Sequence, residues 1–498
     1  MIAYPTLMIF FSACRKLSFR VLLPLLVALP VFSQVKKQEE LINQFEKFKS
    51  GAQQQHQSFI DRNDSLFLQF LQQSWKKVNL IRSELRSPLK PSLQPTLKDS
   101  LRSPFSREVE VDTNQVGTRN LLSLQHNLQM DDPVEYASVS YIKGLQFYGI
   151  ESQLEVKPHL LPELRVISPK SIAEFYTGLT RNKDYWAEQL AVLQNMRSKY
   201  LLNDWGFYQL SSKAAHVFYE SSNERKLLSW YILLRAGYKV KIGYNEELVY
   251  LLFPAKEKLY GTPYFKEDDD IFYVMEENRN AIQDLQTYNN NYPGNSKSVS
   301  FALSEYPLLQ GDKFSKSHQY KGIDFEFTFN RGVLDFLSTY PQCDLRVYFG
   351  PGLTSSNEKK LDDFFQPKLK GLSKRESIDM LLDFCQHAFP YATDQSQFGK
   401  EKYLFSEQSL FFPANDCEDR TIFLSYLIKR YLKLETVALD FPGHVNLGVF
   451  LNESFTGTYI TYIGKKYLIC DPTYINAKSG MLSSEYLSQK AKIIPLTQ

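Results

Sequence analysis

The last quarter of the chain constrains the fold most, because one long helix pattern is followed directly by a run of strand patterns. Apolar residues at helical spacing cover 414–431, and another helix is expected over 373–391. Alternating apolar residues then predict four successive strands, ETVALDF, GHVNLGVFL, GTYITYI and KKYLICDPT. This order predicts an α+β unit at 367–498.

The beginning of the chain has the pattern of a secretory signal peptide. Arg15, Lys16 and Arg20 precede an apolar run at 21–32, which is short for a membrane span. We expect a signal peptide within 1–33, and we expect that translation starts downstream of Met1. The mature protein would then be exported, to the periplasm, the cell surface or the medium, without a transmembrane segment.

Three further regions precede the C-terminal unit. Residues 34–82 have apolar positions at helical spacing and predict a helical stalk of two helices, with a hairpin as one arrangement of the two. This stalk could contact an envelope partner. Scattered prolines make 83–132 a linker candidate, and 133–295 again has the pattern of an α+β unit. In 296–366 we expect a small β element with strands at YKGIDFEFTFN and CDLRVYF.

Composition excludes several classes of protein. Hydrophobic residues make up 43% and aromatic residues 14% of the 498 residues, enough for packed cores. The 58 Lys and Arg nearly balance the 55 Asp and Glu, so a nucleic-acid partner is not expected. The four cysteines beyond the signal peptide are too few for a disulfide framework.

The segment FFPANDCEDRTIFLSYLIKR carries the strongest chemical signal. Asn415 or Asp416 can cap a helix with Cys417 in its first turn, where free N–H groups and the helix dipole stabilise a thiolate. His444 begins a strand after a Pro-Gly break, and Asp471 ends a strand before a proline. An imidazole can take the thiol proton while a carboxylate fixes its tautomer, so these three residues are candidates for thiol catalysis. Each of them alone is more often a core or turn residue.

The order of cysteine on a helix, histidine on a strand and aspartate on the next strand resembles the transglutaminase-like fold of papain-type thiol enzymes. The resemblance covers about 372–498, and blocks such as NDCEDRTIFLSYL and LDFPGHVNLGVF are similar to transglutaminase-like proteins exported by Bacteroidetes-type bacteria. It implies Cys417 as nucleophile, His444 as general base and acid, and Asp471 as its orienter.

Transition-state stabilisation would need two oxyanion donors. The backbone N–H of Cys417 is one, and Gln397, Tyr391 and Asn446 are candidates for the second. We expect Asp419 and Arg420 to form a structural ion pair or cap. Cys470 and Cys385 are expected in the core.

Residues 221–275 can be laid on 417–471 without gaps. LSWYI then falls on LSYLI, and IFYVM falls on YLICD. In this register Ser221, Leu248 and Met275 stand where the three candidate catalytic groups are. We therefore interpret the unit at 133–295 as a degenerate transglutaminase-like copy.

The resulting expectation is an exported thiol enzyme, a cysteine peptidase, amidase or acyl transferase acting on protein, peptide or cell-wall amides. No cofactor and no metal is expected, because no His and Cys cluster has ligand spacing and KEDDD at 266–270 lacks the pattern of a calcium loop. The alternative is a catalytically silent envelope scaffold or binding protein built on the same folds.

Overall fold

The computed structural model describes residues 22–84, 139–275, 282 and 284–496. The chain forms two compact units, Met1–Leu66 and Phe67–Gln498. Most of the expected signal peptide and nearly all of the expected linker lie outside the described residues. Among the described helices, none is both long and apolar enough to cross a membrane.

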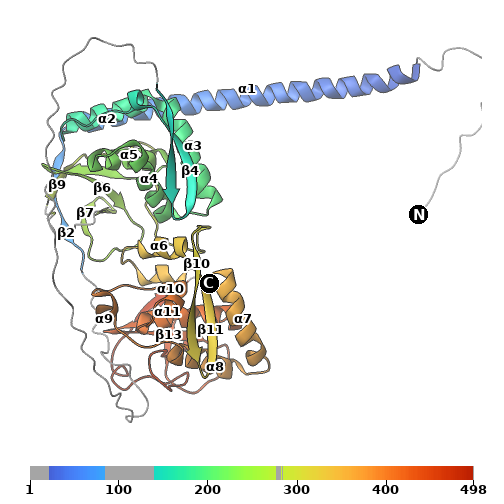
Figure 1. The fold of residues 1–498 in the computed structure, drawn as a ribbon, viewed down its shortest axis with the longest axis vertical. Coiled ribbons are helices and arrows are strands. Elements are labelled where there is room, and N and C mark those ends of the chain that lie inside the picture. Colours follow the sequence, from blue (N-terminus) through green and yellow to red (C-terminus); the bar gives the residue numbers. More distant parts are fainter. Residues whose placement is uncertain (1–21, 85–138, 276–281, 283, 497–498) are drawn as a thin grey trace, which may run out of the picture. The chain divides into compact units, whose positions relative to one another are not determined.

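The expected pair of N-terminal helices is instead one continuous helix, α1 (Leu22–Gln72) (Figure 1). Gly51 is the only glycine or proline between 34 and 72, and one glycine costs a helix about 1 kcal/mol, too little to end it. The prediction of a helical segment up to residue 82 is also wrong at its end. Residues 76–82 form strands β1 (Lys76–Asn79) and β2 (Ile81–Arg82), which become the two edges of a large sheet.

This first sheet has seven antiparallel strands in the order β1-β9-β5-β6-β8-β7-β2. Its inner strands are the apolar ones, and β6 is buried along its whole length because both of its faces are covered. The remaining strands are β5 (Lys241–Tyr244), β6 (Val249–Pro254), β7 (Pro263–Glu267), β8 (Asp270–Val274) and β9 (Asp284–Thr287).

A β-hairpin and a group of helices lie in the chain between the edge strands β1 and β2 and the inner strands of this sheet. Tyr148 and Gly149 both have positive φ, which gives the two-residue turn of the hairpin its mirror-image geometry. The elements are β3 (Tyr141–Phe147), β4 (Ile150–Val156), the 3-10 turn η1 (Pro158–Leu160), α2 (Pro169–Arg181), α3 (Lys183–Lys199), α4 (Asp204–Phe218) and α5 (Ser222–Arg235).

The expected small β element at 296–366 is half right. YKGIDFEFTFN lies in a hairpin, but CDLRVYF forms a 3-10 turn rather than a strand, and helices complete the region. The prediction failed because the turn buries Leu345, Val347 and Tyr348. Apolar residues at this spacing also occur in a strand that is buried on both faces. The elements are β10 (Lys313–Tyr320), β11 (Ile323–Asn330), α6 (Arg331–Ser338), η2 (Leu345–Phe349) and α7 (Ser355–Leu369).

The C-terminal region contains the expected helices and strands. Its antiparallel sheet has the order β14-β15-β13-β12-β16, with α11 packed against β13. The helices are α8 (Lys374–His387), α9 (Asp394–Phe398), α10 (Ser406–Phe411) and α11 (Cys417–Leu432). The strands are β12 (Thr436–Phe441), β13 (His444–Phe450), β14 (Tyr459–Tyr462), β15 (Lys465–Cys470) and β16 (Lys492–Pro495).

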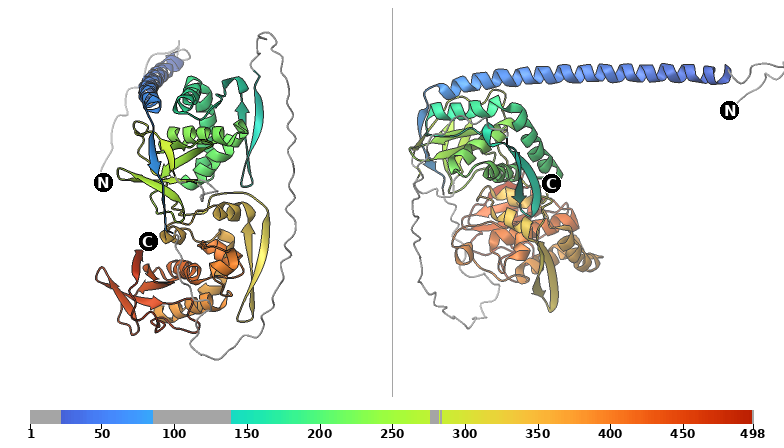
Figure 2. Two further views of the ribbon diagram at one scale, coloured as in Figure 1. Left: turned by 90° about the vertical axis from the view of Figure 1, so that its left-hand side faces the viewer. Right: turned by 45° about the horizontal axis from the view of Figure 1, so that its top comes forward.

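Two halves of the larger unit repeat one topology. We call 141–287 the first repeat and 313–495 the second repeat. Strands β9-β5-β6-β8-β7 follow the same order as β16-β12-β13-β15-β14, and each repeat opens with a hairpin that stands beside its own helices (Figure 2). The internal match found in the sequence therefore corresponds to a duplicated α+β arrangement.

One aromatic core joins the two repeats. The Tyr340 ring of the second repeat lies 6.1 Å from Trp205 of the first repeat and 5.0 Å from Phe405 of its own repeat, measured between ring centroids. Val445 and Ile422, which flank the candidate site, belong to the same buried cluster as the helices of the first repeat. Residues of the second repeat therefore pack in two buried clusters, one of its own and one shared with the first repeat.

Candidate active site

Helix α11 delivers Cys417 as its first residue. Asp416 occupies the N-cap position but makes no side-chain capping bond. One turn later, the Thr421 hydroxyl donates to the Val445 carbonyl oxygen at 2.9 Å, which fixes the start of the helix beside β13. The Cys417 Sγ donates to Glu418 Oε2 at 3.0 Å. In this arrangement the sulfur is a thiol rather than a thiolate.

His444 and Asp471 form a buried pair. His444 Nε2 lies 2.9 Å from Asp471 Oδ2, and neither side chain is exposed. The other carboxylate oxygen, Oδ1, accepts from the backbone N–H groups of Thr473 and Tyr474, at 2.9 and 3.1 Å. The turn after β15 therefore fixes the carboxylate, and the carboxylate fixes one ring nitrogen of the imidazole.

The surroundings of this pair make the imidazole of His444 a stronger base than a free one. Burial lowers the pKa of His444, but the charge of Asp471 and its hydrogen bond, helped by Glu418 and Glu485, raise the pKa above its usual value. Nδ1 of His444 is buried and has no hydrogen-bond partner among the described residues. This nitrogen is therefore the one available to exchange a proton with a thiol.

Tyr486 covers the pair. Its ring stacks on the His444 ring with centroids 4.6 Å apart and planes 22° apart, and it is itself buried. Burial raises the pKa of the Tyr486 phenol, as do a hydrogen bond to Glu485 and the nearby charges of Cys417 and Asp471. Tyr486 therefore stacks on one of the three sequence-predicted residues and is close enough to the other two for their charges to affect its pKa. Each of the three has 0% exposure, so the structure has a closed site.

The oxyanion candidates lie in different places. With its amide nitrogen turned toward the carboxylate, Asn446 lies 3.2 Å from both oxygens of Asp471 and 2.9 Å from His444 Nε2. The Asn446 amide therefore contacts Asp471 and the ring nitrogen that faces Asp471, and these contacts do not support the prediction that it stabilises an oxyanion. Tyr391 pairs with Asn415 just before Cys417, which makes it better placed, and Gln397 lies in α9.

Asp419 and Arg420 are buried and have structural contacts. The Asp419 carboxylate accepts from the Leu404 N–H at 2.9 Å. The guanidinium of Arg420 is fully buried and donates to three backbone carbonyls. These carbonyls belong to Asn415, Gln386 and Phe389, at 3.3, 3.1 and 2.6 Å.

The other described cysteines are core residues. Cys385 and Cys470 are buried in the core of the second repeat, and Cys343 is buried beside Tyr348. Burial raises the pKa of all three thiols. None of these three described cysteines forms a disulfide. Cys417 differs from the other three in being the first residue of a helix, and this helix is bonded through Thr421 to Val445, the residue after His444.

Acidic side chains gather behind Cys417. Two overlapping groups each have carboxylate oxygens within 4.8 Å of one another. They are Asp394, Asp416 and Asp419, and Asp394, Glu401 and Glu418. Carboxylates are ligands for hard cations such as Ca²⁺, but here Asp394 and Asp419 also accept backbone N–H groups that hold the loop before α10. Sequence spacing did not reveal this cluster, because its members come from separate segments.

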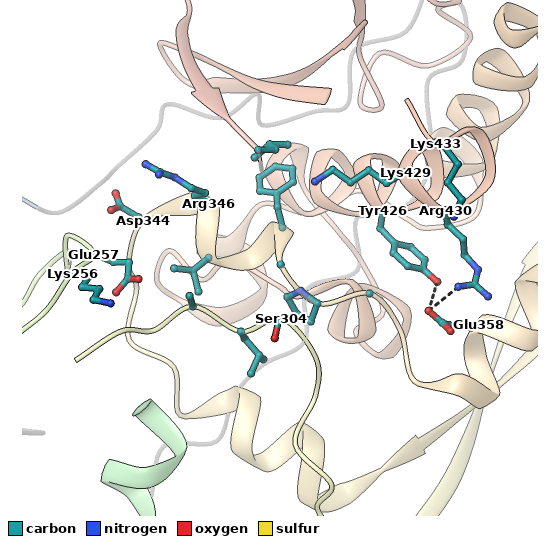
Figure 3. A pocket seen from close by; sticks show the side chains of 18 residues that line it. Lys256, Glu257, Ser304, Asp344, Arg346, Glu358, Tyr426, Lys429, Arg430 and Lys433 are labelled. Atoms are coloured by element: carbon teal, nitrogen blue, oxygen red, sulfur yellow. Dashed lines mark hydrogen bonds and ion pairs between the residues drawn. The ribbon is translucent and has the colours of Figure 1, made fainter. Parts of the chain in front are cut away.

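A cleft of about 750 Å³ lies at the other end of α11 (Figure 3). Lys429, Arg430 and Lys433 line it, a placement that complements the negative end of the helix dipole. Glu358 accepts from Tyr426 at 3.1 Å and from Arg430 at 3.0 Å, so part of the charge is already compensated. Because Cys417 is the first residue of α11, this cleft is remote from the candidate thiol.

Sequence reasoning missed three residues that shape the site. Gln386 donates to the backbone oxygen of Asp471 at 3.1 Å and accepts from the Asn476 N–H at 3.1 Å, so it holds the carboxylate turn. Glu418 contacts the sulfur, and Tyr486 covers the imidazole. Only Glu418, adjacent to Cys417, carried a signal in the sequence.

No family model, no curated protein and no solved structure matches the chain.

Proposed function

We propose that the second repeat is a transglutaminase-like thiol enzyme that cleaves or transfers amide bonds. The observation that carries the proposal is the buried His444–Asp471 pair at 2.9 Å, with Nδ1 of His444 unbonded beside a helix that begins with Cys417. A fixed carboxylate, an imidazole and a thiol at a helix start are the groups that thiol acyl transfer uses.

The reaction balances with these groups alone. His444 takes the thiol proton, and Cys417 Sγ attacks the amide carbonyl carbon. The C–N bond then breaks, and the amine leaves with the proton from His444. Water, or a second amine, attacks the thioester with His444 as base, which releases a carboxylic acid or a new amide and restores the thiol. Backbone N–H groups at the start of α11 would stabilise the oxyanion.

The closed site supports a second candidate function, a catalytically silent envelope scaffold. All three side chains are fully buried, and the first repeat has none of the three groups at the matching positions. A silent envelope scaffold would also have these features. Under the enzyme proposal, the segment that carries Tyr486 has to move before a substrate can reach Cys417.

The proposal includes an exported protein acting on peptides or cell-wall amides. It is supported by the basic and apolar N-terminal pattern at 15–33. Helix α1 could contact an envelope partner, because Phe45 and Phe48 are 64% and 74% exposed on it.

Trapping the covalent intermediate tests the proposal. The full chain and its Tyr486→Ala variant would be incubated with peptide amides and cell-wall peptides, and intact mass would be followed. We expect an adduct of acyl mass on Cys417 that hydroxylamine removes and that persists in Cys470→Ala. Turnover in Cys417→Ala would show that another group does the chemistry, and no adduct with any amide in the opened variant would favour the scaffold.

A further inference from the structure

The first repeat has a hollow where the second repeat has its closed triad. This hollow, of about 550 Å³, is lined by Leu251 and Met275. In the ungapped register Met275 matches Asp471, and Leu251 matches Leu447, which lies next to Asn446 on β13. Because the two sheets share one strand order, the hollow and the triad occupy corresponding places in the repeats.

The charge of the hollow is opposite to that of the triad region. His216, Arg225 and Lys226 line it, and none of its described lining residues is Asp or Glu. In the same register Glu418, the acid that contacts the thiol, is replaced by Ser222, and Thr421 by Arg225. The duplicated site has therefore lost its reactive groups and gained cationic ones.

Arg225 is held in place without being neutralised. Its Nη1 lies 3.1 Å from Nδ1 of His216, and burial and the Arg225 charge both lower the pKa of that imidazole. A neutral imidazole accepts from the guanidinium and leaves its positive charge intact. The acid next to it on α5, Glu224, instead accepts from the Leu164 N–H at 2.9 Å.

One wall of the hollow is aromatic and rigid. The Trp205 ring lies 5.1 Å from Tyr208, and its Nε1 donates to the Thr339 hydroxyl at 3.0 Å. Tyr208 packs on Phe253 at 5.4 Å between ring centroids. Polar groups that could bond a peptide backbone complete the lining, namely Gln209, Ser212, Ser222 and Ser229. Cationic and apolar surfaces thus lie side by side.

We propose that this hollow binds a peptide with a free carboxylate, with Arg225 holding the carboxylate and the aromatic wall holding an apolar side chain. A guanidinium fork matches both oxygens of a carboxylate, and an apolar wall adds nothing for a bare inorganic anion. The site is a binding site without chemistry. It stands independently of the proposed function, because no step of it uses Cys417.

The test is binding measured by calorimetry on the full chain in the Cys417→Ala background, where turnover is blocked. The probes are acetyl-Leu-Phe with a free carboxylate and the same peptide as its C-terminal amide. We expect the acid to bind at least about tenfold more tightly than the amide, and Arg225→Gln to remove that preference. Arg181→Gln, an exposed arginine of α2, is the matched control and should bind as the parent does.

A second variant guards against misfolding. Ser212→Phe fills the hollow and leaves the charge unchanged, so it should weaken binding of both probes while thermal unfolding stays near the parent's. The proposal is overturned if acid and amide bind equally, if neither binds, or if Arg225→Gln has no effect. It is also overturned if millimolar phosphate replaces the acid equally well, or if His444→Ala abolishes binding, which would place the peptide at the triad.

Discussion

Replacing Tyr486 with alanine should open the candidate active site. The Tyr486 ring is 5% exposed and stacks on His444 at 4.6 Å, so closure of the segment between β15 and β16 depends on burying it. Burying an aromatic ring of this size contributes about 2–3 kcal/mol. Since 1.4 kcal/mol is a factor of ten, the open population should rise by roughly 30- to 140-fold.

Alkylation of the cysteines by iodoacetamide, resolved by peptide mass spectrometry, measures this opening. Cys417 should be labelled roughly 30-fold faster or more in Tyr486→Ala than in the parent. Cys343, Cys385 and Cys470 are buried in cores and serve as internal controls, because only global unfolding should expose them. Tyr459→Ala, at an exposed tyrosine of β14, is the matched substitution. An unchanged rate at Cys417, or equal acceleration at all four cysteines, would refute the reasoning.

Three further predictions concern stability, measured as the free energy of unfolding in urea. The raised pKa of His444 stabilises the fold at pH values below the unfolded pKa near 6.5, and this stabilisation is lost as the pH rises through the folded pKa. The loss of stability caused by Asp471→Asn should therefore be larger at pH 5.5 than at pH 9. A pH-independent deficit would contradict this. Arg420→Met leaves three buried carbonyls without a donor and should cost about 3–5 kcal/mol, whereas a loss under about 1 kcal/mol would show that water replaces the guanidinium. Gly149 and Gly322 both turn hairpins at positive φ, but an added Cβ meets a backbone oxygen at 2.1 Å at Gly149 and open space at Gly322. Gly322→Ala should cost about 1 kcal/mol and Gly149→Ala clearly more, and equal losses would count against the packing of the first hairpin.

Local patterns predicted the second repeat well. Apolar spacing located α11 and strands β12, β13 and β15, because each of them is buried over most of its length. The ungapped match of 221–275 to 417–471 also indicated the duplication, and the two sheets share one strand order. Ser221 is the N-cap of α5, one position before the helix, whereas Cys417 is the first residue of α11.

Long-range contacts limited the rest. The local sequence at 76–82 did not predict strands, because β1 and β2 form by pairing with β9 and β7, about 200 residues away in the chain. Tyr486 could not be assigned to the site, since it approaches His444 only through the long segment between β15 and β16. The acidic cluster behind Cys417 was hidden for the same reason, as it gathers side chains from three separate segments.

The central claim is that Cys417 and His444 act as one thiol–imidazole pair. Its most direct measurement is the pH dependence of Cys417 alkylation in the opened Tyr486→Ala variant, with and without His444→Ala. We expect rapid alkylation near neutral pH in the presence of His444, and a shift to the behaviour of an ordinary thiol, with a pKa of about 8.5 or higher, in its absence. Alkylation that follows one and the same pH profile with and without His444 would contradict the pair.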